Sequence, residues 1–163
     1  MKIKIKFFAL GGTIDKIYFD AMSKYQVGPP RIKEILEDAR VGFKYEIKSL
    51  LQKDSLDMTD DDRSLVLKAV SNEPCDRIVI THGTDTMIQT AMVLKNIPKK
   101  TIVFTGAMEP ASFKSSDASF NLGCAVAAVQ TLAPGVYIAM NGNIFNPENA
   151  IKSRTLKQFQ KKY

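Results

Sequence analysis

The stretch RIVITHGTDTMIQTAMVLKNI, residues 77–97, decides the fold class of this chain. It opens with a short run rich in β-branched residues, 77–81, which suits a buried strand of a parallel sheet. A small polar loop follows, and residues 86–97 then favour a helix that Pro98 stops. A strand, a polar loop and a helix in this order predict one unit of an α/β fold.

The same alternation of strand-like and helix-like segments runs through the whole chain. The predicted strands are residues 2–10, 43–51, 77–81, 101–106 and 135–142, and the predicted helices are residues 29–40, 59–72, 86–97 and 117–132. Thr59 is the expected N-cap of the second helix, which carries three aspartates in its first turn. Five strands separated by four helical segments predict a Rossmann-like three-layer α/β domain with a mainly parallel sheet. At 163 residues the chain has the length of one domain.

Composition narrows the class of protein. Hydrophobic residues make up 45% of the chain and charged residues 25%, as in an ordinary globular domain. No apolar run approaches the roughly 20 residues that span a bilayer, and the short apolar run near the N-terminus is too brief for a secretory signal. We therefore expect a cytoplasmic protein. Cys75 and Cys124 have no metal-ligand spacing, so we expect reduced, buried thiols and neither a disulfide nor a zinc site.

The basic tail carries most of the net charge. From Asn149 onward the chain has five lysines and arginines and no acidic side chain, against a net charge of +6 for the whole chain. Such a tail could bind nucleic acid, but no aromatic-rich RNA motif or recognition helix accompanies it. We expect a solvated terminal helix or a frayed end, and no nucleic-acid partner.

Polar and glycine-rich residues follow each predicted strand. These segments are GGTIDK, KDSLDM, THGTDT, TGAMEP and NGNIF, and four of the five hold a hydroxyl residue. Ligands of open α/β sheets bind at the carboxyl ends of the strands. If these ends converge, they form one pocket lined with hydroxyls, carboxylates and backbone N–H groups.

Thr13 is the first candidate in this pocket. Two glycines before it let the backbone turn sharply and approach a ligand. Its hydroxyl could act as a nucleophile if a base removes its proton, or it could only punctuate the turn. The segment lacks the pattern of a phosphate-binding loop.

Thr84 and Asp85 allow two interpretations. Either side chain could cap the helix that begins near Thr86, and the free N–H groups of that helix could equally stabilise an oxyanion. His82 could be a general base, but a single histidine beside a glycine is more often structural.

Further candidates lie in the loops and the tail. Lys152 could be a surface lysine, or it could fold back onto Asp85 and form an ion pair. Ser55 and Asp57 could be turn residues or could hold a polar substrate. Tyr25 lies in the long loop 14–28, which could be a lid.

Taken together, these motifs resemble the bacterial-type L-asparaginase family. GGTID resembles the family's first threonine signature and THGTDTM its second. Y-x-V-G at 25–28, DS-x-DM at 54–58, TGAM-x-P at 105–110 and the helix SDASFNLGCAV occur in the family's order. The resemblance covers nearly the whole chain.

The resemblance implies an amidohydrolase that converts L-asparagine to L-aspartate and ammonia through a threonine acyl-enzyme, without a cofactor or a metal. Thr13 would be the nucleophile and Tyr25 would assist its deprotonation, while Thr84, Asp85 and Lys152 would orient substrate or water. The substrate-binding residues would be Gly12, Ser55, Gly83 and Ala107, with the Ala107 carbonyl meeting the leaving nitrogen.

The chain also departs from the family's pattern. The family's smaller C-terminal domain is absent, so we expect residues 1–163 to form a single domain of the N-terminal type. Leu56 stands where many longer members carry a polar residue that contacts the substrate amine. The family implies a homo-oligomer, a dimer or tetramer. Alternative functions are a glutaminase or other amidase of the same mechanism, a module that binds asparagine or aspartate without turnover, and a tRNA-dependent amidotransferase component.

Overall fold

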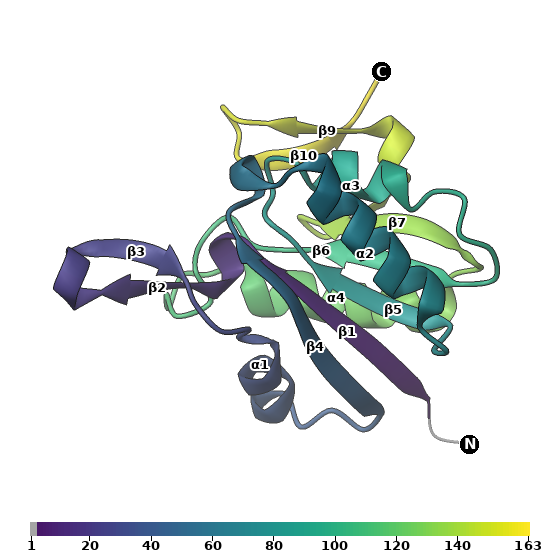
Figure 1. Ribbon diagram of the computed structural model, residues 1–163, viewed down its shortest axis with the longest axis horizontal. Coiled ribbons are helices and arrows are strands. Elements are labelled where there is room, and N and C mark those ends of the chain that lie inside the picture. Colours follow the sequence, from purple (N-terminus) through teal and green to yellow (C-terminus); the bar gives the residue numbers. More distant parts are fainter. Residues whose placement is uncertain (1–2) are drawn as a thin grey trace.

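The computed structural model describes residues 3–163 and is built around a six-stranded sheet (Figure 1). The strand order is β4 (Lys44–Lys53), β1 (Lys4–Gly11), β5 (Arg77–Thr81), β6 (Thr101–Thr105), β7 (Gly135–Met140) and β8 (Asn143–Phe145). The first five strands are parallel and β8 is antiparallel to β7. The predicted α/β class with a mainly parallel sheet is confirmed.

Helices cover both faces of the sheet. They are α1 (Ile32–Asp38), α2 (Asp60–Asn72), α3 (Met87–Val93) and α4 (Ala118–Thr131). Side chains of α2 and α3 pack with one set of strand residues, and those of α1 and α4 pack with the alternate set (Figure 1). Because successive residues of a strand point to opposite faces, a buried run such as β5 feeds both layers. Thr59 caps α2 as predicted, since its hydroxyl accepts from the Asp62 N–H.

The chain reverses between β7 and β8, which the sequence analysis did not anticipate. Asn141 and Gly142 occupy this turn with φ angles of 54° and 72°. Asn-Gly is the commonest pair for a two-residue hairpin turn, because both positions need a left-handed backbone. The turn was therefore readable from the sequence.

The segment expected as a long loop, 14–28, is largely ordered as a hairpin. A 3₁₀ turn, η1 (Thr13–Asp15), leads into β2 (Lys16–Phe19), the turn η2 (Asp20–Met22) and β3 (Lys24–Val27). Tyr18 and Tyr25 face each other across the two strands, with ring centroids 5.4 Å apart. Cross-strand aromatic pairs of this kind stabilise short strands. The β2–β3 hairpin projects from the body of the domain (Figure 1).

The basic tail is neither a helix nor a frayed end, so that expectation was wrong. The turn η4 (Pro147–Asn149) leads into a second hairpin, formed by β9 (Ala150–Ser153) and β10 (Gln158–Lys161). An earlier turn, η3 (Ser55–Asp57), joins β4 to α2. Ala150 and Phe159 are buried in the core beside α3, and the Phe159 N–H donates to Asn141 Oδ1 over 2.8 Å. Two buried apolar side chains thus anchor a segment whose charges dominate its sequence.

The two cysteines are free thiols, but they are half-buried rather than fully buried as expected. Cys75 precedes β5 and Cys124 lies on α4, at positions where packing covers only part of each side chain. Within residues 3–163 no helix is long and apolar enough to cross a bilayer. The same residues contain no cluster of His, Cys, Asp and Glu side chains that could hold a metal ion.

Candidate active site

The carboxyl ends of four neighbouring strands meet in close backbone contact. The Gly12 N–H, after β1, donates to the Lys53 carbonyl of β4 over 2.9 Å, and the His82 N–H, after β5, donates to the Thr105 carbonyl of β6 over 3.0 Å. A Cβ on Gly12 would lie 2.4 Å from the Gly83 backbone. The glycines therefore allow strand ends to approach more closely than side chains would permit.

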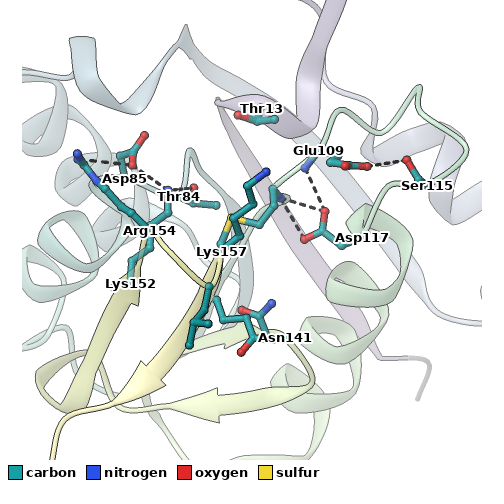
Figure 2. A pocket seen from close by; sticks show the side chains of 13 residues that line it. Thr13, Thr84, Asp85, Glu109, Ser115, Asp117, Asn141, Lys152, Arg154 and Lys157 are labelled. Carbon is teal, nitrogen blue, oxygen red and sulfur yellow. Dashed lines mark hydrogen bonds and ion pairs between the residues drawn. The ribbon is translucent and has the colours of Figure 1, made fainter.

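An open cavity of about 480 Å³ lies above this junction (Figure 2). Its lining combines hydroxyl, carboxylate, amide and cationic side chains from several elements. These residues are Thr13, Thr84, Asp85, Met108, Glu109, Ser115, Asp117, Asn141, Lys152, Arg154, Leu156, Lys157 and Gln158. The cavity thus brings together four of the five residues expected to be catalytic.

Thr84, Asp85 and Lys152 form one hydrogen-bonded group. Lys152 Nζ donates to Thr84 Oγ1 over 2.7 Å and to Asp85 Oδ1 over 2.8 Å. The side chains of Lys152 and Asp85 are only 17% and 27% exposed, which weakens screening of the ion pair by solvent. Because the ammonium occupies a lone pair of the Thr84 hydroxyl, the hydroxyl proton is left to point elsewhere. Of the two interpretations of Lys152, the structure adopts the one in which it folds back onto Asp85.

Thr13 lines the same cavity from the turn that follows β1. It begins η1 directly after Gly11 and Gly12, whose φ angles of 98° and 87° turn the chain out of β1. Figure 2 shows Thr13 separated from Thr84 and Lys152 by the space of the pocket. A substrate between them could meet a hydroxyl on one side and an ammonium-carboxylate pair on the other.

The four expected substrate-binding residues, Gly12, Ser55, Gly83 and Ala107, are not among the residues that line the cavity. Ser55 is buried in η3, and a Cβ on Gly83 would lie 2.6 Å from the Ser55 Cβ. Ala107 is buried in the loop after β6. Gly83 thus lies against both Gly12 and Ser55.

Tyr25 lies outside the residues that line the cavity. It sits on β3 of the projecting hairpin, is 48% exposed, and packs edge-on against Phe113 with ring centroids 5.5 Å apart. In this arrangement the structure does not bring Tyr25 together with Thr13. A direct role of its hydroxyl requires the hairpin to move.

The interpretation of Thr84 or Asp85 as a helix cap was wrong. The N-cap of α3 is Thr86, and no side chain accepts a capping hydrogen bond there. Thr86 Oγ1 instead donates to the Ser55 carbonyl over 2.8 Å, which ties η3 to the loop after β5. Asp85 is directed to Lys152, so its carboxylate belongs to the cavity.

His82 has a structural environment. It is fully buried, with Nδ1 2.6 Å from the Gly83 carbonyl and Nε2 2.7 Å from Thr90 Oγ1. Because a carbonyl only accepts, Nδ1 carries the proton and Nε2 accepts from the hydroxyl. Burial lowers the pKa of His82 from about 6.5 to about 4.

His82, the chain's only histidine, is therefore expected to stay neutral through the physiological range. A lowered pKa means that its contribution to stability is present above about pH 6.5 and is lost as the pH falls toward 4. A ¹H–¹⁵N spectrum of the ring should show no titration between about pH 8 and pH 5. A midpoint near 6.5 would contradict this burial.

Asp117 is a site residue that the sequence analysis did not single out. Its carboxylate accepts from the Met108 and Glu109 N–H groups at 3.0 and 3.2 Å and from Asn121 Nδ2 at 2.9 Å (Figure 2). Asn121 also donates to the Gly106 carbonyl over 3.0 Å. This network holds the loop that carries Ala107. An aspartate just before a helix is a recognisable candidate for such backbone contacts.

The turn of the β9–β10 hairpin adds two cations that were also missed. Arg154 Nη2 lies 3.9 Å from Asp85 Oδ1, and Lys157 lines the cavity with a left-handed backbone at φ 50°. Figure 2 shows the Lys157 ammonium pointing into the pocket. These residues could not be assigned from sequence because the tail was expected to lie away from the body.

Comparison with known proteins places this geometry in context. The family model described as "Asparaginase, N-terminal" matches residues 4–161. A probable periplasmic L-asparaginase of Haemophilus influenzae is 33% identical over 163 aligned residues, covering 93% of this chain and 46% of that protein. A glutaminase-asparaginase of Pseudomonas aeruginosa is 38% identical over 97 residues, covering 56% of this chain and 27% of that protein.

A solved structure shows the same fold. The thermostable L-asparaginase of Thermococcus kodakarensis superposes with a TM-score of 0.84 at 30% identity, covering 98% of this chain and 51% of that chain. The chain therefore spans about half the length of the relatives that it matches.

Proposed function

The chain belongs to the asparaginase family, matching its N-terminal domain, and we propose that it is an amidohydrolase that converts L-asparagine to L-aspartate and ammonia. The single observation that carries the proposal is the Lys152–Thr84–Asp85 group facing Thr13 across one cavity. The names of the relatives support asparagine as the substrate. The activity is proposed for a chain that spans about half of their length.

The proposed reaction has two steps, and each conserves atoms and charge. Thr13 Oγ1 attacks the side-chain amide carbonyl and the hydroxyl proton passes to the amide nitrogen. The C–N bond then breaks, which releases ammonia and leaves an aspartyl ester on Thr13. Water then adds to the ester, and the Thr13 hydroxyl is released with aspartate. The steps use side chains, backbone groups and water, with no cofactor.

The second group has a separate role in this proposal. The Lys152 ammonium and Asp85 carboxylate hold the Thr84 hydroxyl in one orientation, so that it can position the attacking water and pass its proton. A preorganised polar group of this kind stabilises charge as it develops in the transition state. Tyr25 would assist the deprotonation of Thr13 after the β2–β3 hairpin moves toward the cavity.

In this proposal, substrate binding would use residues at the strand ends. Ser55 and the Gly83 backbone would hold the α-carboxylate, Asp85 the α-ammonium, and the Ala107 carbonyl the leaving nitrogen. Leu56 beside Ser55 is 65% exposed and offers the amine no hydrogen bond. Asp85 would therefore bind the α-ammonium without a hydrogen bond from the Leu56 side chain. We further propose that the protein is a homo-oligomer in the cytoplasm.

The direct test measures ammonia release from L-asparagine by the purified chain, with L-glutamine in parallel. We expect release from asparagine. Faster release from glutamine would instead favour the glutaminase reading, which the name of the Pseudomonas relative supports. Thermal stabilisation by asparagine with no ammonia after long incubation would replace the enzyme with a binding module.

Lys152→Met is expected to lower kcat for asparagine by about a hundredfold or more, because the Thr84 hydroxyl loses its orienting donor. Lys161→Met is the matched control, since Lys161 lies on β10 of the same hairpin and outside the cavity lining. Initial rates of ammonia release check both. Equal kcat values for the two variants would remove Lys152 from the mechanism.

A further inference from the structure

The carboxyl group of Asp15 is buried next to the candidate active site and is incompletely paired. The residue is 1% exposed, and its Oδ1 accepts from the Arg31 N–H over 3.0 Å. Its Oδ2 is one of the few buried side-chain atoms in the described chain without a hydrogen-bond partner. A buried, half-satisfied carboxyl group is costly, so its presence calls for a functional reason.

Asp15 joins three segments of the chain. Its N–H donates to the Gly12 carbonyl over 3.2 Å, and its own carbonyl accepts from the Gly28 N–H over 2.8 Å. Its carboxylate holds the Arg31 N–H at the start of α1. Thr13 lies two residues earlier in the same turn, and β2 starts at the next residue. The hairpin that carries Tyr25 therefore leaves and rejoins the body at Asp15.

The rest of the β2–β3 hairpin has little support from the body. Tyr18, Phe19 and Met22 are each about half exposed, and the Tyr25 ring contacts Phe113. Figure 1 shows the hairpin projecting from the sheet, attached at its base. The hydrogen bonds at the base must therefore set most of its angle to the cavity.

We propose that Asp15 is a positioning residue whose ionised carboxylate clamps the base of this hairpin against the turn that carries Thr13. This inference rests on the proposed function, because it assigns the clamp to the same hydrolytic site. Asp15 does not line the cavity, so it acts through Thr13 and the hairpin rather than on the substrate. A hydrogen bond to a carboxylate is roughly twice as strong as one to a neutral acceptor. Ionisation of Asp15 would therefore strengthen its hydrogen bond from the Arg31 N–H.

The electrostatic surroundings disfavour the ionised form of Asp15, so the proposed clamp depends on pH. Burial raises the pKa of Asp15 to about 7, opposed by the Arg31 N–H and guanidinium. That guanidinium pairs with Glu34 over 2.8 Å, and the neighbouring Lys16 pairs with Asp54 over 2.8 Å. Because the pKa is raised on folding, the folded protein loses stability as the pH rises through about 7. A residue needed only as an acceptor would be better served by asparagine.

Asp15→Asn keeps the shape and the acceptor oxygen but removes the charge, and Asp20→Asn at the exposed hairpin tip is the matched control. We expect kcat of Asp15→Asn to be about five- to tenfold below wild type near pH 8.5 and to approach wild type near pH 5.5, with KM within about twofold. Its melting temperature near pH 8.5 should equal or exceed that of wild type. Asp20→Asn should match wild type in both.

Two results would overturn the proposal: a kcat for Asp15→Asn within twofold of wild type near pH 8.5, or a lower kcat accompanied by a lower melting temperature. If this variant does not fold, Arg31→Pro and Arg31→Ala decide the matter. Proline removes the N–H that Asp15 holds at a position with φ −90°, whereas alanine keeps it. A kcat for Arg31→Pro several-fold below that of Arg31→Ala supports the clamp, and equal values refute it.

Hydrogen exchange separates this inference from the proposed function. If the wild type releases no ammonia, the function fails, yet the clamp still predicts faster exchange of the Gly28 amide in Asp15→Asn than in wild type near pH 8.5. Equal exchange rates would refute the clamp independently of any activity.

Discussion

Thr13→Ala is expected to reduce kcat for L-asparagine by about a thousandfold or more, because the variant lacks the hydroxyl proposed to attack the amide. Thr84 lines the same cavity, but its Oγ1 already accepts a hydrogen bond from Lys152 Nζ. The same ammonium is ion-paired with Asp85. Loss of a nucleophile lowers kcat and leaves substrate binding largely intact. Steady-state ammonia release with both parameters fitted checks this expectation.

Two controls make the Thr13 result interpretable. Thr13→Ser restores a hydroxyl and should recover part of the rate. The melting temperature of Thr13→Ala should stay close to that of wild type, because the side chain is only half-buried. A Thr13→Ala variant that is folded and hydrolyses asparagine at the wild-type rate would remove Thr13 as the nucleophile.

Gly12→Ala is expected to have the largest effect on stability, at least about 3 kcal/mol. The residue has φ 87°, and a Cβ there would lie 2.4 Å from the backbone N and Cα of Gly83. Backbone atoms cannot rotate away as a side-chain terminus can, so β1 and β5 would have to separate at the site. The melting temperature should fall by about 6 °C or more, or the chain should fail to fold.

Gly123→Ala is the matched control on α4. A Cβ at Gly123 meets no neighbouring atom, so the change should stabilise the helix by about 0.5–1 kcal/mol. Thermal unfolding of both variants measures the comparison. A Gly12→Ala protein as stable as wild type would show that the strand ends are less tightly joined than described.

The elements with strong periodicity were predictable from sequence. Residues 78–80 and 102–104 are continuous apolar runs because both faces of the sheet are covered, and that pattern has few alternatives. The shared edge of the parallel strands then predicts that Thr13, Thr84 and Asp85 line one pocket, as they do.

The errors lie where tertiary contacts decide. The β2–β3 hairpin has strands of four residues each, too short for alternation to stand out, and its position relative to Thr13 depends on hydrogen bonds to Asp15. The tail forms β9 and β10 because Ala150 and Phe159 are buried, a fact hidden by the surrounding charge. The ion pair of Lys152 with Asp85 joins residues 67 positions apart. From the sequence, this ion pair could be predicted only on the condition that the tail folds back onto the loop that carries Asp85.

The most direct test of the central claim is to locate the covalent intermediate. Trypsin should release Thr13 within residues 7–16 and Thr84 within residues 78–95, so the two threonines fall in different peptides. Wild-type protein turning over L-asparagine would be quenched in acid within milliseconds and digested for mass spectrometry. We expect an added aspartyl group on the 7–16 peptide, absent from Thr13→Ala. An aspartyl group on the 78–95 peptide instead would contradict the assignment of Thr13 as the nucleophile.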